Sequence, residues 1–144
     1  MKLSRMRNFL IPVSLGLIIS TNVFGQSQSF RCNFSDGLST NWDSGKPSSK
    51  RTSDMSELIF DQIDIKKGTG RMIGNSGSET VQVLKGDSST HIVERTPSGN
   101  MNITTIFNPT QKYSDLYPVV HSRHINLMSG PFPSQYVGLC KNLK

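Results

Sequence analysis

The side chains best suited to binding or catalysis cluster in one short segment, His121-Ser122-Arg123-His124. Successive side chains of a β-strand point to opposite faces, so His121 and His124 would lie on opposite sides and could not bind one metal ion together. His121 and Arg123 instead share a face with Tyr117. An imidazole, a guanidinium and a phenol on one face could line an anion-binding pocket. The alternative is an outer strand face that is exposed to solvent.

Catalytic motifs do not accompany this cluster. The segment Gly74-Asn75-Ser76-Gly77 lacks the spacing of a hydrolase nucleophile elbow, and the glycines between positions 68 and 77 lack the Lys-Ser/Thr ending of a phosphate-binding loop. We therefore predict a protein that is not an enzyme and needs no metal or cofactor. The single tryptophan, Trp42, lies in a long polar stretch from Gly37 to Asp54. We predict a loop there, with at most one short strand, and regard Trp42 as a candidate binding residue because function often resides in loops.

The N-terminal segment has the features of an export signal. Residues 1–8 carry three positive charges, residues 9–20 are mostly apolar, and Val23-Phe24-Gly25 offers a cleavage site. A transmembrane helix needs about 20 apolar residues, and this run is shorter. We predict a signal peptide over residues 1–25, a periplasmic or secreted protein, and no membrane span after cleavage.

The two cysteines, Cys32 and Cys140, lie near the two ends of the predicted mature chain. In an oxidising compartment they are expected to form one disulfide. Closing a loop of roughly 109 residues would stabilise the fold by about 4 to 5 kcal/mol. The bond requires Cα atoms within about 7 Å, so the first and last strands are predicted to be neighbours, as in a closed or nearly closed barrel.

Length and charge limit the possible functions. The residues from 26 to 144 are enough for one compact domain and too few for two. Without Lys2, Arg5 and Arg7, the chain keeps 13 basic and 10 acidic residues, a balance of +3. This charge is too small to predict binding to a nucleic acid. We expect a monomer whose partner is a small molecule, an envelope component or a protein.

From Phe30 onward, short runs of β-favouring residues alternate with turn clusters. The predicted strands are Phe30–Asp36, Glu57–Ile63, Gly70–Asn75, Thr80–Lys85, Thr90–Thr96, Met101–Phe107, Tyr117–Leu127 and Gln135–Lys141. Seven or eight such strands in sequential order predict an all-β antiparallel meander that forms a closed or partly open barrel, lipocalin-like in shape. A β-sandwich is the alternative.

Two finer predictions concern the end of this meander. Within Met101–Phe107, we expect the side chains at 101, 103, 105 and 107 to face the core. The link Ser129–Pro133 contains two prolines, so we expect it to lie outside a central ladder.

Four segments resemble a group of small exported bacterial proteins that carry one cysteine near each end of the mature chain. These segments are Phe30-Arg31-Cys32-Asn33-Phe34, Thr96-Pro97-Ser98-Gly99-Asn100, Val120-His121-Ser122-Arg123-His124 and Pro133-Ser134-Gln135-Tyr136-Val137-Gly138-Leu139-Cys140. The resemblance implies export and brings no catalytic residue. Better-known barrels match less well, because Trp42 does not stand in the Gly-x-Trp start of lipocalins and the several tryptophans of avidins are absent.

The chain also resembles the periplasmic inhibitors of lysozyme in size, export signal and terminal cysteines. Ser98-Gly99 is similar to their inhibitory Ser-Gly loop. Lysozyme is cationic, so a mature chain at +3 would repel it. The sequence thus predicts a non-enzymatic exported binding barrel, and inhibition of lysozyme or another hydrolase is the alternative.

Overall fold

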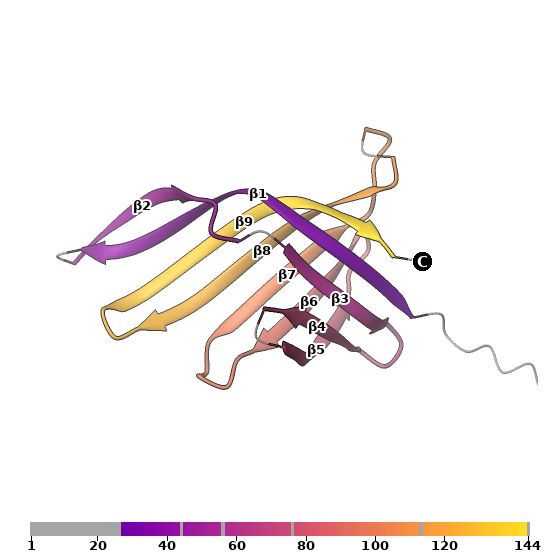
Figure 1. Cartoon of the computed structure of the whole chain (residues 1–144), viewed down its shortest axis with the longest axis horizontal. Coiled ribbons are helices and arrows are strands. Elements are labelled where there is room, and N and C mark those ends of the chain that lie inside the picture. Colours follow the sequence, from indigo (N-terminus) through magenta and orange to yellow (C-terminus); the bar gives the residue numbers. More distant parts are fainter. Residues whose placement is uncertain (1–26, 44, 56, 76, 113, 144) are drawn as a thin grey trace, which may run out of the picture.

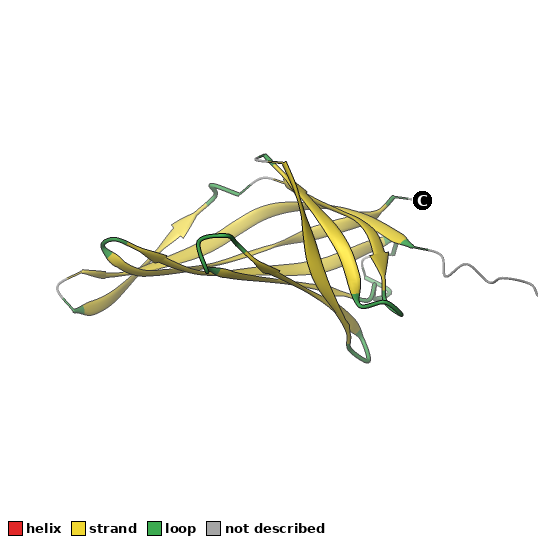
Figure 2. Cartoon of the chain, turned by 90° about the horizontal axis from the view of Figure 1, so that it is seen from below, coloured by secondary structure: helices red, strands yellow, loops and turns green. Residues whose placement is uncertain are grey.

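The computed structural model describes residues 27–43, 45–55, 57–75, 77–112 and 114–143, so the predicted signal peptide lies outside the described residues. These residues form nine strands and no helix (Figure 2). The strands are β1 (Gln28–Asp43), β2 (Lys46–Thr52), β3 (Glu57–Asp64), β4 (Thr69–Gly74), β5 (Gly77–Lys85), β6 (Ser89–Arg95), β7 (Met101–Phe107), β8 (Leu116–Leu127) and β9 (Gly130–Asn142). The described part of the chain therefore holds no helix that could span a membrane.

Eight of the strands close into an antiparallel β-barrel. From β3 to β9 each strand pairs with the next one in the sequence, and β1 pairs with both β3 and β9. The pairing of the first strand with the last closes the sheet (Figure 1). The predicted all-β meander and its barrel are confirmed, and the β-sandwich alternative is wrong.

The ninth strand, β2, lies outside the closed ring. It pairs with the second half of β1, from Gly37 to Asp43, along the same edge that β3 occupies near the start of β1. On the other side, β8 and β9 remain paired as far as Leu127 and Gly130, beyond the last partner of β7 at His124. The outer parts of β2, β1, β9 and β8 thus project from the barrel as a sheet that we call the flange (Figure 1).

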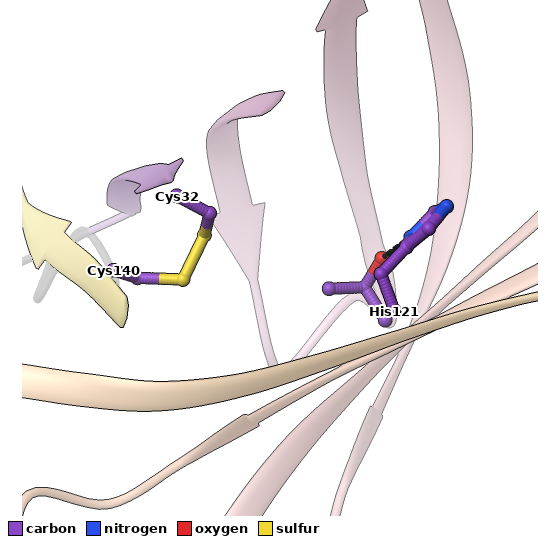
Figure 3. The surroundings of a disulfide bond; sticks show 4 residues. Cys32, His121 and Cys140 are labelled. Carbon is purple, nitrogen blue, oxygen red and sulfur yellow. Dashed lines mark hydrogen bonds between the residues drawn. A yellow bond between two sulfur atoms is a disulfide. The ribbon is translucent and has the colours of Figure 1, made fainter. Parts of the chain in front are cut away.

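A disulfide joins the two strands at the point of closure. Cys32 of β1 lies directly opposite Cys140 of β9, and their Cα atoms are 3.9 Å apart. Both residues are completely buried, and Figure 3 shows the bond between their sulfur atoms. The predicted pairing is confirmed. An intramolecular disulfide is typical of proteins that fold in an oxidising environment.

The apolar core fills the half of the barrel that contains this disulfide. Its buried members come from every strand of the barrel except β4: Phe30, Cys32, Leu58, Phe60, Ile63, Val81, Val83, Ile92, Ile106, Val119 and Cys140. Tyr117 packs against this cluster, with its ring edge-on to that of Phe30 at 5.2 Å between centroids. The core needs few residues because the interior of a small barrel is narrow.

The predicted loop from Gly37 to Asp54 is wrong for most of its length. The structure continues β1 to Asp43 and adds β2. A β-bulge between Phe34 and Asp36 shifts the register, so the inward face passes from even-numbered to odd-numbered residues. Because the inward face changes at the bulge and polar side chains lie on both faces, the sequence shows no continuous alternation of apolar and polar residues that would predict this strand.

The predicted orientation of β7 is also wrong. Thr104 and Ile106 are 2% exposed, whereas Met101 and Phe107 are 44% and 39% exposed. The even-numbered side chains therefore point inward, although they include the more polar ones.

The prolines near the start of β9 do not keep this segment out of the sheet. Pro131 pairs with Asn126 and Pro133 with His124. Proline is tolerated there because β1 stops pairing with β9 at Ser134, so the segment has one neighbouring strand and a free edge.

Candidate functional site

The interior of the barrel turns from apolar to polar toward the end that carries the flange. On β8, Tyr117 and Val119 contact the apolar half, while His121 and Arg123 follow on the same inward face. The predicted alternation along this strand is confirmed: His121 is 2% exposed and His124 is exposed to solvent. The two histidines therefore point to opposite faces of the sheet.

His121 sits at the boundary between the two halves. Its Nδ1 atom is 2.7 Å from the hydroxyl oxygen of Thr104 on β7, and its ring lies 5.8 and 6.3 Å from those of Phe34 and Tyr136. Burial, followed by the positive charge of Arg123, lowers the pKa of His121 to about 4. The imidazole is neutral at pH 7, and Figure 3 shows its hydrogen bond as a dashed line.

The buried ring of Tyr136 carries a hydroxyl that reaches the connection between β2 and β3. This hydroxyl donates a 2.7 Å hydrogen bond to Oδ1 of Asp54, which Thr52 also contacts at 2.7 Å. These two bonds lower the pKa of Asp54, and the charge of Arg123 lowers it further. The connection is thereby fixed against the barrel, and a carboxylate faces the same polar region as Arg123.

A row of directly opposed polar residues crosses the barrel one step beyond His121. Glu94 on β6 pairs with Asn102 on β7, which pairs with Arg123 on β8. Arg123 pairs with Ser134 on β9, and Ser134 with Ser39 on β1. Directly opposed residues of antiparallel strands point to the same face, with Cβ atoms about 5 Å apart. We call these five residues the polar row.

The polar row leaves several hydrogen-bonding groups without a protein partner. The hydroxyls of Ser39 and Ser134 are buried, at 3% and 5% exposure, and have no hydrogen bond to any described residue. The same is true of Oδ1 of Asn102, whose Nδ2 donates to Glu94. Buried polar groups in proteins nearly always have a partner. Three such atoms in one row are free to form hydrogen bonds with water or with a bound molecule.

Arg123 occupies the centre of this row. Among the described residues, no carboxylate oxygen lies within the 4.0 Å that defines an ion pair with it. Its two neighbours in the row, Asn102 and Ser134, both carry unpartnered atoms. A second cation, Lys50 on β2, pairs with Ser39 and extends the row onto the flange. A guanidinium in this setting can bind a carboxylate through two hydrogen bonds.

The structure brings together only part of the predicted site. His121 and Arg123 lie in the polar half, whereas Tyr117 packs at the other end of the barrel, six residues or about 20 Å along β8 from Arg123. Trp42 is 42% exposed and lies on the flange opposite Pro47. The described residues contain no group of three or more His, Cys, Asp and Glu side chains that could hold a metal ion.

Sequence reasoning missed Ser39, Asn102, Ser134 and Asp54. Their types are common on loops and strand surfaces, and their importance comes from pairing across strands that are distant in the sequence. A partial signal existed in the alternation of β7, where Asn102 and Thr104 share a face with Ile106.

The fold and the site define a closed eight-stranded antiparallel barrel with an additional strand and a half-polar interior. Comparisons with known protein families, with curated proteins and with solved structures find no match.

Proposed function

We propose that this protein is an exported, non-enzymatic binding barrel that holds a small hydroxylated carboxylate, such as a sugar acid, at the polar row. The observation that carries the proposal is the set of unpartnered atoms of Ser39, Asn102 and Ser134 around Arg123. The disulfide at the closure of the barrel supports export to the periplasm or the exterior, because such bonds persist in oxidising compartments.

The carboxylate is inferred from the charge at the centre of the row. Arg123 makes no direct ion pair among the described residues, and Lys50 lies three strands away on the same face. A partly buried guanidinium that makes no direct ion pair can bind an anionic ligand, although Asp54 is close enough for its pKa to respond to this charge. Asp54 and Glu94 limit the total positive charge, so one carboxylate fits better than a doubly charged phosphate.

The hydroxyl group is inferred from Asn102. Because its Nδ2 donates to the carboxylate of Glu94, its Oδ1 can only accept a hydrogen bond. A simple carboxylate has no donor to offer, whereas a neighbouring hydroxyl has one. The hydroxyls of Ser39 and Ser134 can donate to or accept from the same ligand.

Titration followed by NMR tests this proposal. The probes are D-glucuronate, D-glucose and acetate, added to the purified mature protein while the backbone amide resonances are recorded. We expect glucuronate to bind more tightly than either control and to shift amides of β7, β8, β9 and β1. Arg123→Gln should abolish this shift, while Lys46→Gln at the far end of β2 should not. If glucuronate leaves these amides unchanged, the proposal is wrong.

A second candidate function, inhibition of lysozyme or a related hydrolase, is favoured by one observation. The turn between β6 and β7 presents the exposed Ser98 and Gly99 on a rigid frame, in which Gly99 N–H donates to the carbonyl of Thr96 and Asn100 contacts Ser98. A rigid exposed turn is suited to insertion into an enzyme cleft. An equimolar amount of protein should then slow cell-wall lysis by lysozyme, and unchanged lysis would exclude this function.

A further inference from the structure

A cavity lies at the end of the barrel opposite the polar row. It encloses about 160 Å³ and lies between the starts of β1, β6 and β8 and the ends of β5 and β7. Its walls combine the apolar side chains of Phe30, Ile65, Ile106 and Tyr117 with the polar ones of Gln28, Thr90 and Asn108. Phe30 and Ile106 are almost fully buried and form its base, while Ile65 is 36% exposed at its rim. None of these residues belongs to the polar row, so this site is independent of the function proposed above.

The size and the walls of the cavity select its ligand. A cavity of about 150 Å³ is large enough for one benzene molecule, so this one has room for a single aromatic ring against its apolar walls. The rings of Phe30 and Tyr117 already stand edge-on to each other at 5.2 Å. A third ring would extend this arrangement, since aromatic pairs prefer such geometries.

The charge at the rim selects the substituent on that ring. Lys85 is the one charged residue among the described residues that line the cavity. It lies at the end of β5, directly opposite the buried Thr90, which pairs in turn with Ile106. An ammonium group beside these apolar walls favours a ligand that joins an apolar ring to a carboxylate.

A groove of about 460 Å³ that opens to solvent adjoins the cavity. It shares Tyr117 and Pro109 with the cavity and carries Lys141 together with Asp115. Because the groove contains both signs of charge, it does not compete with Lys85 for an anion.

We infer that this cavity is a second binding site, which takes a small aromatic carboxylate with its ring against Phe30 and Tyr117 and its carboxylate at Lys85. Glucuronate and similar sugar acids carry no apolar ring, so the two ends of the barrel would select different molecules.

Isothermal titration calorimetry with benzoate, and with benzamide as its uncharged analogue, tests the inference. We expect benzoate to bind more tightly than benzamide. Lys85→Gln should weaken benzoate binding about fivefold, in line with the loss of a partly exposed charge pair, and leave benzamide unchanged. Ile65→Trp, which fills the cavity from its exposed rim, should abolish binding of both.

Two controls separate this site from the polar row. Lys46→Gln on the flange and Arg123→Gln in the polar row should leave benzoate binding unchanged, provided that both variants keep the thermal unfolding temperature of the parent. The inference is overturned if benzoate does not bind, or if its binding survives both Lys85→Gln and Ile65→Trp. Either result would leave the glucuronate experiment unaffected.

Discussion

Replacing His121 by asparagine should remove most of the loss of stability that the protein shows in mild acid. Asparagine can keep a hydrogen bond to Thr104, because its amide reaches the position of the Nδ1 atom that makes this bond at 2.7 Å. It cannot be protonated, so the variant isolates the titration of the imidazole. The smaller side chain leaves a gap, and we expect about 1 to 2 kcal/mol lower stability at pH 7.

The magnitude follows from the pKa of His121. Burial lowers it from 6.5 to about 4. Between these values the unfolded chain binds a proton that the folded chain does not, so the free energy of unfolding falls as the pH falls through this window. Each pKa unit corresponds to 1.36 kcal/mol, which gives a total loss of about 3 kcal/mol once the pH is near 4.

Other groups contribute little in the upper part of this window. The carboxyl groups of Asp36, Asp54, Asp61 and Asp64 all have a pKa below 3.8 in the folded protein. Their stabilisation is present above the unfolded pKa and is lost only as the pH falls below it. Measurements between pH 4.5 and 7 therefore report mainly on the histidine.

Urea denaturation at several pH values between 4.5 and 7 provides the assay, with the free energy of unfolding extrapolated to water. The parent protein should lose about 2 to 3 kcal/mol over this range, and His121→Asn should lose much less. His124→Asn is the matched control, because this histidine is exposed and the variant should follow the parent curve. A parent-like pH dependence in His121→Asn would refute the reasoning.

Three further predictions concern the frame of the barrel, each measured by urea denaturation at pH 7. Replacing both Cys32 and Cys140 by alanine should cost about 4 kcal/mol, because the disulfide spans a separation of 108 residues; a loss below about 1 kcal/mol would contradict the entropic argument. Gly138→Ala should lower the free energy of unfolding by about 3 kcal/mol or more, since its Cβ would lie 2.0 Å from the carbonyl oxygen of a β1 residue. The control variant Gly74→Ala meets no atom within 4 Å and should be close to neutral. Equal effects of the two variants would be inconsistent with the clash. Tyr136→Phe should lower the free energy of unfolding by about 1 kcal/mol, because it loses the hydrogen bond to the exposed carboxylate of Asp54. An unchanged stability would show that this bond contributes nothing.

The architecture was largely accessible from the sequence because it depends on local signals. Strand β7 begins and ends where its residue types predict, and β8 differs from the prediction by one residue. The pairing of Cys32 with Cys140 follows from having two cysteines in a chain that is predicted to be exported, and it implies the neighbouring strands that close the barrel.

The site was less accessible because it depends on register. A bulge near Asp36 shifts the inward face of β1 by one residue, so Ser39 becomes an interior residue although nothing in its local sequence marks it. Asn102 was assigned to the outside because hydrophobicity favours Ile103 as the core residue. This assumption fails in a barrel whose interior is half polar, where Asn102 contacts Glu94 instead.

The free side of β2 has a consequence for how copies of this protein behave in concentrated solution. An unpaired strand invites a neighbouring molecule to add its own strand and so begin a fibre. Here the outermost strand reads Lys-Pro-Ser-Ser-Lys-Arg-Thr and its side chains face solvent. Two such strands would bring six cations together, and each proline would interrupt the ladder. Both features discourage self-association along this border.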